Sequence, residues 1–163
     1  GAAAWGDSDR LTNPFYKRLR QVLCLGSEGR VSVDRSFIKY HKRGQEEPFS
    51  KKLVEIVGAP IPQEMMWNPD AVLNIDDIEH TEITRKRVDM AAALQLVFED
   101  ALFHIVDHLI RHTGSHQLVL SGGTALNCLA NMRLMECFND MYYLQNLGRS
   151  GRRLLWVPKI GAC

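Results

Sequence analysis

The chain has 163 residues, of which 45% are hydrophobic and 24% are charged, and its formal net charge is +1. This length and composition fit one globular domain that can bury a core without crosslinks. The near-neutral charge makes nucleic acid an unlikely partner, and no apolar run is long enough to cross a bilayer. With no secretory signal at its start, we expect a cytoplasmic protein without a membrane partner.

The first part of the chain is predicted to hold a loop, a helix and extended chain. The first dozen residues are expected to form the loop. Asn13-Pro14 is a typical helix start, with Asn13 as the cap, and Gly26 is expected to end that helix. The alternation in Arg30-Val31-Ser32-Val33 then predicts one strand or a loose hairpin.

Residues 48–57 predict a short amphipathic helix that Gly58 ends. The next stretch, residues 59–77, contains Pro60, Pro62 and Pro69 and is expected to be an irregular surface connector.

The longest element is a helix predicted from about Ile83 to His112. At about 100° per residue, one stripe of mostly apolar residues falls on one side of this helix. The stripe contains Val88, Ala91, Ala92, Gln95, Glu99, Leu102, Val106 and Leu109.

Two polar residues, Gln95 and Glu99, lie one turn apart within this apolar stripe. Burying them without partners would cost on the order of a few kcal/mol. In one interpretation they bond to neighbouring groups of the protein. In the other, they line a ligand cleft, where Glu99 accepts hydrogen bonds from hydroxyls such as those of a ribose. The residues alone leave both interpretations open.

Three histidines on the same helix, His104, His108 and His112, are spaced by four residues and could share a metal ion. They lie opposite the apolar stripe, and Glu does not follow His104 as it does in the HExxH pattern. We therefore predict solvent-facing histidines and assign no metal site.

A strand, a glycine turn and a helix are predicted around Leu118-Val119-Leu120-Ser121-Gly122-Gly123-Thr124. Adjacent glycines let the backbone approach an anionic ligand closely, and the helix expected to open near Thr124 would direct its positive end there. A nucleotide is the expected ligand, although many such turns merely reverse the chain. In the following helix Asn127 could reach this ligand, or Asn127 and Asn131 could tie down adjacent loops.

The remainder of the chain is predicted to be less regular. After Asn139 the pattern loosens, residues 148–153 are expected to form a mobile turn, and Leu154 to Val157 to form a strand whose edges need covering. The four cysteines, Cys24, Cys128, Cys137 and Cys163, have neither CxxC nor zinc-ribbon spacing, so we expect reduced thiols. Cys128 is interpreted as a small buried hydrophobe.

The stretch from Leu118 to Asn131 resembles the carbamoyltransferases of the nodulation and antibiotic-biosynthesis type, in which it commonly reads SGGVALNCxAN. Several further segments fall in the order expected for that family: residues 1–7, 49–58, 90–99 and 155–158. The resemblance implies a partial actin-like ATPase (ribonuclease-H-like) half-domain, α/β and helix-rich with a short sheet. It also implies carbamoyl transfer from carbamoyl phosphate to a substrate hydroxyl through a carbamoyl-adenylate, with ATP and a divalent metal.

By this resemblance, Ser121, Gly122, Gly123 and Asn127 would hold the nucleotide, and Gln95 with Glu99 would line its pocket. The metal-binding HxxxH of the family belongs to an N-terminal half that is absent here. The expected Gly-Asp-Ala-Gly stretch is replaced by Lys159 to Cys163. No catalytic residue is assigned.

We therefore expect residues 1–163 to be a fragment of a nucleotide-binding domain that needs the missing half or a partner chain for activity. The first alternative is a non-catalytic nucleotide-binding or scaffold module that acts through a partner. The second is a relative that modifies transfer RNA, which the weak positive charge disfavours.

Overall fold

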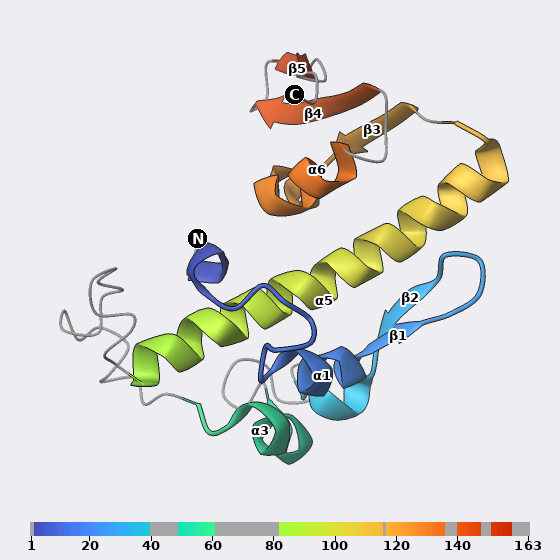
Figure 1. Ribbon diagram of the computed structural model, residues 1–163. Coiled ribbons are helices and arrows are strands. Elements are labelled where there is room, and N and C mark those ends of the chain that lie inside the picture. Colours follow the sequence, from blue (N-terminus) through green and yellow to red (C-terminus); the bar gives the residue numbers. More distant parts are fainter. Residues whose placement is uncertain are drawn as a thin grey trace. The chain divides into compact units, whose positions relative to one another are not determined.

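The computed structural model describes residues 2–39, 49–60, 82–115, 117–135, 140–147 and 151–157, the last two ranges and residues 82–84 by their backbone alone. The chain divides into two compact units, residues 1–101 and 102–163. Helix α5 (Glu82–Thr113) passes through the boundary between them (Figure 1). The expected connector lies outside the described residues beyond position 60.

The first unit contains short elements beside the N-terminal part of α5. In chain order they are η1 (Ala2–Trp5), α1 (Tyr16–Leu19), η2 (Arg20–Val22), β1 (Leu23–Leu25), β2 (Val31–Val33), η3 (Arg35–Phe37) and α3 (Lys51–Val57). The expected N-terminal loop therefore begins with a 3-10 turn.

The first helix begins at Tyr16 with Phe15 as its N-cap, so the predicted cap at Asn13 is two residues too early, and the helix is much shorter than expected. Asn13 holds the turn before the helix, because its Oδ1 accepts hydrogen bonds from the backbone N–H groups of Phe15, at 2.8 Å, and Tyr16, at 3.1 Å. The prediction that the helix continues to Gly26 is wrong, because β1 pairs with β2 in an antiparallel hairpin. Pairing with a later strand gives these backbone groups partners that helical spacing cannot reveal.

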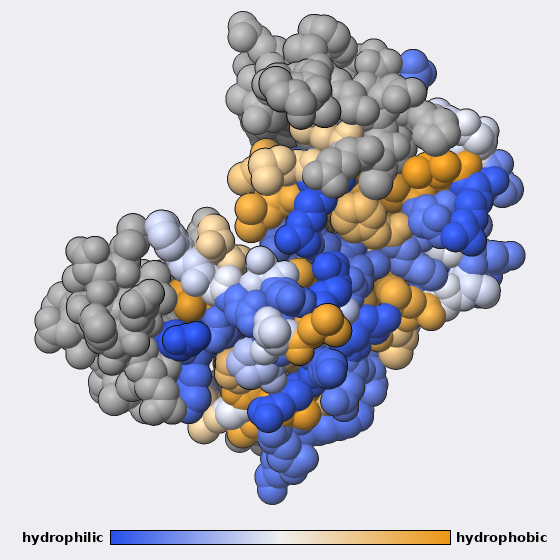
Figure 2. Space-filling model, viewed as in Figure 1, coloured by the Kyte–Doolittle hydropathy of each residue, from blue (hydrophilic) through white to orange (hydrophobic). Residues whose placement is uncertain are grey.

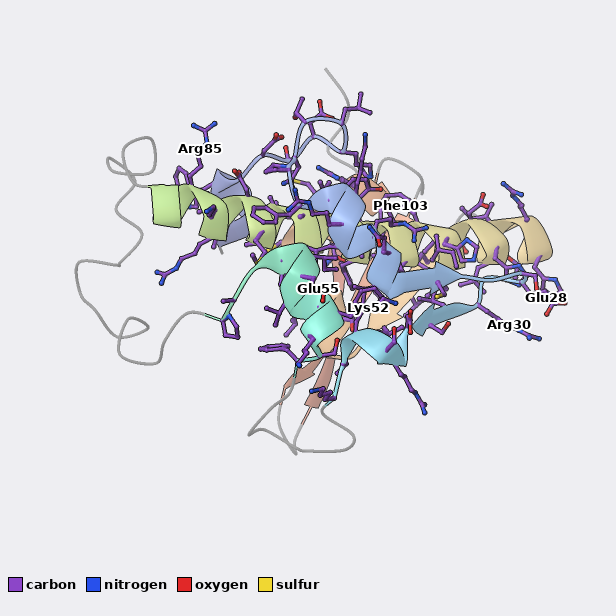
Figure 3. The ribbon with its side chains drawn as sticks, turned by 90° about the horizontal axis from the view of Figure 1, so that it is seen from below. Glu28, Arg30, Lys52, Glu55, Arg85 and Phe103 are labelled. Carbon is purple, nitrogen blue, oxygen red and sulfur yellow. The ribbon has the colours of Figure 1, made fainter. Side chains whose placement is uncertain are left out.

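Residues 31–33 confirm the predicted strand, but its hairpin partner is the segment 23–25, which was expected to be helical. The turn of this hairpin places Glu28 at φ +56° and Gly29 at φ +68°. The Arg30 N–H donates to the Ser27 carbonyl at 3.1 Å, which closes the turn. Figure 3 shows Glu28 and Arg30 at the tip of this hairpin.

Helix α3 confirms the predicted helix at residues 48–57, although it begins at Lys51. Ser50 is its cap, since the Ser50 Oγ accepts from the Leu53 N–H at 3.1 Å. Gly58 ends the helix with φ +96°, a conformation that glycine adopts without a steric penalty. Lys52, on the first turn, lies over the Phe37 ring and 3.3 Å from the Asp34 carboxylate (Figure 3).

Helix α5 confirms the predicted long helix to within a residue or two at each end. Val88, Ala92, Glu99 and Val106 of the predicted stripe are buried. Leu109 is 43% exposed, so its predicted burial is wrong. In the first unit the buried face is rotated toward Ala93 and Leu96, because Phe15 and Leu19 pack against Ala93.

The second unit places a three-stranded sheet against helices. After α5 come β3 (Gln117–Ser121), η6 (Gly123–Leu126), α6 (Cys128–Met135), β4 (Asp140–Leu147) and β5 (Gly151–Val157). The strand order is β3-β4-β5, in which β3 and β4 are parallel and β5 is antiparallel to β4. The core of this unit joins Val106 and Leu134 to half-buried Leu118 and Leu120.

The expectation of irregular chain after Asn139 is wrong, because residues 140–147 form a strand. Tyr142 pairs with Val119 on one side and with Trp156 on the other. The predicted strand at 154–157 is confirmed and begins earlier, at Gly151. Residues 148–150 of the expected turn, and the segment after Val157, lie outside the described residues.

The described elements confirm an α/β protein, rich in helix with short sheets. The actin-like form of the fold stays a prediction. Within the described ranges, α5 included, no helix has the length and apolar character needed to span a membrane. On the face drawn in Figure 2, apolar residues lie among hydrophilic ones.

Candidate functional site

The glycine corner joins strand β3 to the next helical turn. Gly122 has φ +89° and ψ 177°, a conformation that is accessible almost only to glycine. A Cβ built on Gly122 or on Gly123 would meet no atom of the described residues within 4 Å. Ser121, Gly122, Gly123 and Thr124 are exposed. In the described part of the chain, the corner therefore offers bare backbone that side chains do not fill.

The helix expected near Thr124 begins four residues later. Residues Gly123–Leu126 form a 3-10 turn, and α6 starts at Cys128. Asn127 caps α6, since its Oδ1 accepts from the Ala130 N–H at 3.1 Å. The Asn127 side chain accepts a hydrogen bond from a free backbone N–H of the first turn, so the α-helix begins at Cys128. The positive end of its dipole therefore lies at Cys128.

The two asparagines both hold local structure. The Asn131 Nδ2 donates to the Ala125 carbonyl oxygen at 2.7 Å, while the Asn127 Oδ1 caps the helix. Asn131 thus ties down an adjacent turn, as one of the two interpretations had it, whereas Asn127 caps its own helix. A ligand contact by Asn127 stays a prediction.

Gln95 and Glu99, on α5 in the first unit, contact each other. The Gln95 Nε2 donates to the Glu99 Oε1 at 2.8 Å. Glu99 is only 1% exposed, and the Arg10 Nη2 lies 3.9 Å from its Oε2. The amide and the guanidinium offset part of the cost of burying this carboxylate. The prediction that Gln95 and Glu99 line a pocket stays a prediction.

Asp100 forms a polar cluster that was not predicted from the sequence. Its Oδ1 accepts from the Arg10 Nε at 3.0 Å and from Nη2 at 2.8 Å, and its Oδ2 accepts from the Tyr16 hydroxyl at 2.6 Å. The Arg20 Nε lies 3.4 Å from Oδ2. Burial, and then the hydrogen bond to Asp100, raise the pKa of Tyr16. No local sequence signal joins these residues, because 80 or more residues separate Asp100 from each partner.

The three histidines are less exposed than predicted. His112 is exposed, but His104 and His108 are half-buried. The rings of His108 and His112 stack with centroids 5.8 Å apart. Within the described ranges, no three His, Cys, Asp or Glu side chains gather as a metal site would require.

Cys128 is exposed, so its predicted burial is wrong. It is the first residue of α6, whose buried side carries Ala130 and Leu134. Cys24 is also exposed, and neither residue is in a disulfide. Cys137 and Cys163 lie outside the described residues.

The comparison with known families agrees with the motif at this corner. Residues 64–152, which include β3, the glycine corner and α6, match the family described as the carbamoyltransferase N-terminus. The chain belongs to this carbamoyltransferase family.

Three curated relatives are similar over part of the chain. The uncharacterized protein sll1178 of Synechocystis is 31% identical over 87 residues, which are 53% of this chain and 12% of that protein. The nodulation proteins NolNO of Sinorhizobium fredii and NolO of Bradyrhizobium diazoefficiens are each 36% identical over 61 residues, or 36% of this chain. Those residues span 9% and 11% of the two proteins. No solved structure matches the chain.

Proposed function

We propose that this chain is the nucleotide-binding portion of an ATP-dependent carbamoyltransferase. Membership in the family supports carbamoyl transfer as the reaction class. In the proposed reaction, carbamoyl phosphate and water first give carbamate and phosphate. A carbamate oxygen then bonds to the α-phosphorus of ATP and pyrophosphate leaves, which forms a carbamoyl-adenylate from which the carbamoyl group passes to a substrate hydroxyl. In the last step the hydroxyl oxygen bonds to the carbamoyl carbon, its proton is released, and AMP leaves.

The open backbone at Gly122 and Gly123 is the observation that carries this proposal. Glycine has no Cβ, and no atom of the described residues lies within 4 Å of where one would stand, so a phosphate group can approach the backbone directly. The proposed contribution of the corner is positional and electrostatic, since it offers backbone dipoles and no acid or base. Ser121 and Asn127 flank the glycines and are proposed to hold the same nucleotide.

Gln95 and Glu99 are proposed to contact the ribose. The Gln95 amide donates to one oxygen of the Glu99 carboxylate, and the Arg10 guanidinium lies 3.9 Å from the other. Glu99 is only 1% exposed. A ribose hydroxyl would therefore have to displace a neighbouring group to bond to this carboxylate.

The family also implies a divalent metal. The described residues do not supply a set of three ligands, so we assign none of them to a metal and derive no step that depends on one.

A non-catalytic scaffold is the second candidate function, and one observation favours it. Asn127, Asn131, Gln95 and Glu99 all make hydrogen bonds within the protein, as they would in a module that binds no ligand.

Thermal unfolding of the 163-residue chain at increasing ATP concentration separates the two functions. A ligand that binds the folded state stabilises it by about 2.7 kcal/mol at a concentration 100 times its Kd. We expect the midpoint to rise steadily with ATP and to rise less with adenosine, which lacks phosphates. An unchanged midpoint at millimolar ATP contradicts the nucleotide site and supports the scaffold.

A further inference from the structure

Asn131 connects helix α6 to the turn that follows the glycine corner. Its Nδ2 donates to the carbonyl oxygen of Ala125, in the middle of η6, at 2.7 Å. Its own backbone N–H donates to the Asn127 carbonyl at 3.0 Å, which fixes it within α6. The side chain therefore reaches back across six residues and closes the turn onto the helix.

Two backbone hydrogen bonds hold the same turn. The Ala125 N–H donates to the Gly122 carbonyl, and the Asn127 N–H donates to the Thr124 carbonyl, each at 3.1 Å. The bond from Asn131 adds a third point of attachment. Of these three hydrogen bonds, only the bond from the Asn131 side chain can be removed by a side-chain substitution.

The two ends of this connection differ in their surroundings. Ala130 and Leu134 of α6 are fully buried, and Leu134 packs in the core of the second unit. Gly122 and Gly123 are exposed. Asn131 is thus held on a helix anchored in the core, and it restrains a corner at which the described residues leave the glycines open.

We propose that Asn131 is a positioning residue that fixes the Gly122–Gly123 corner in the shape that receives the phosphates of ATP. This inference rests on the proposed function. A corner that is ordered before binding loses less conformational freedom when the ligand arrives, so binding is tighter.

Two substitutions of similar size to asparagine test the role of Asn131. Asn131→Leu removes the donor, and Asn131→Asp replaces the donor with an oxygen that repels the Ala125 carbonyl. Met132→Ala changes the next residue, which is 65% exposed, and serves as the matched control.

The ATP and AMP affinities of each variant would be measured by calorimetry at a temperature well below the midpoint of its thermal unfolding. Amide hydrogen exchange at Ala125 and Asn127 would be followed in parallel. We expect both Asn131 variants to bind ATP about tenfold more weakly, with a smaller change for AMP. Exchange at the two amides should become faster, and the Met132 variant should match the wild type.

The outcomes separate this inference from the function on which it rests. Wild-type binding of ATP, together with undiminished binding by a folded Asn131 variant, overturns the role of Asn131 and leaves the nucleotide site standing. Weaker binding without faster exchange also overturns positioning. If Asn131→Leu does not fold, the ATP affinity and the amide exchange of Asn131→Asp test the role of Asn131. Absence of ATP binding by the wild type removes the proposed function itself and this inference with it.

Discussion

Gly6 lies directly against the backbone of helix α5 at Val88. A Cβ on Gly6 would overlap the Val88 carbonyl group and would lie 2.8 Å from the Ala92 Cβ. The next residue is held at the same place, since the Asp7 N–H donates to the Asp89 Oδ1 at 2.8 Å. The missing side chain thus allows the N-terminal segment to pack closely on the long helix.

We predict that Gly6→Ala lowers the free energy of unfolding by about 1–3 kcal/mol, because the helix backbone cannot move aside cheaply. Denaturant unfolding measures the change. Gly26→Ala is the control, since its Cβ would make an ordinary contact 3.4 Å from the Arg30 Cβ. Equal stability of the two variants contradicts the close packing of Gly6.

Asp100→Ala should lower the free energy of unfolding by about 2 kcal/mol, because it leaves the partly buried Arg10 and Tyr16 without their acceptor. The matched control is Asp107→Ala on the same helix. Asp107 pairs with Arg111 at an exposed site, where such pairs contribute roughly 0.3–0.5 kcal/mol. If both variants lose the same free energy of unfolding, the Asp100 cluster stabilises the chain no more than an exposed ion pair does.

Thr12→Val should raise the pKa of Asp7 toward its ordinary value of 3.8. The Thr12 hydroxyl bonds to the Asp7 carboxylate and, with the Asp9 N–H, lowers that pKa in the folded chain. A carboxyl group with a lowered pKa contributes stability above its unfolded pKa, and this contribution is lost as the pH falls through the folded value. Carbon NMR titration of the Asp7 carboxyl group measures the shift. Thr113→Val should leave it unchanged, and an unchanged value in Thr12→Val contradicts the assignment.

Glu28→Asn should raise the free energy of unfolding by about 0.5–1 kcal/mol. Glu28 has φ +56° in the hairpin turn, a conformation that asparagine tolerates better before glycine. The ion pair lost with Arg30 is exposed on both sides and contributes little. Glu28→Gln removes the charge but keeps the strained backbone, so it should not stabilise the chain. A thermal midpoint that rises equally in both variants would point to the charge instead.

The sequence predicted those elements whose signals are local. Helix α5 is long and periodic, Gly58 directly follows the helix that it ends, and the run from Leu118 to Gly123 places a strand directly before its turn. Each of these signals depends on residues within a few positions of one another.

The errors arose where a distant partner decides the structure. Residues 23–25 have helical spacing with the preceding helix but pair with residues 31–33. Residues 140–147 form a strand because they pair with β3 and β5. The Asp100 cluster joins residues that lie far apart along the chain. Such tertiary contacts override the local preference of a segment for helix or strand.

At the candidate site, the glycine corner was predicted in the correct place, but its helix was not. The double glycine and a following Thr suggested that the α-helix opens at once. Asn127 caps the helix instead of Thr124, because its side chain accepts a hydrogen bond from the N–H three residues ahead. A 3-10 turn therefore occupies residues 123–126, between Gly122 and the helix. Asn131 bonds to that turn, as one of the two interpretations of the asparagines had it.

The ATP affinity of Gly123→Ala tests the nucleotide site most directly. Gly123 has no positive φ, and a Cβ there would meet no atom within 4 Å in the described ranges, so the alanine variant should fold without strain. We predict that calorimetry shows ATP binding to the wild type and to Gly26→Ala. Gly123→Ala should bind ATP at least about tenfold more weakly, which is a loss of about 1.4 kcal/mol of binding free energy. Its thermal midpoint without ATP should equal that of the wild type. Equal ATP affinity in all three proteins would contradict a phosphate site at this corner.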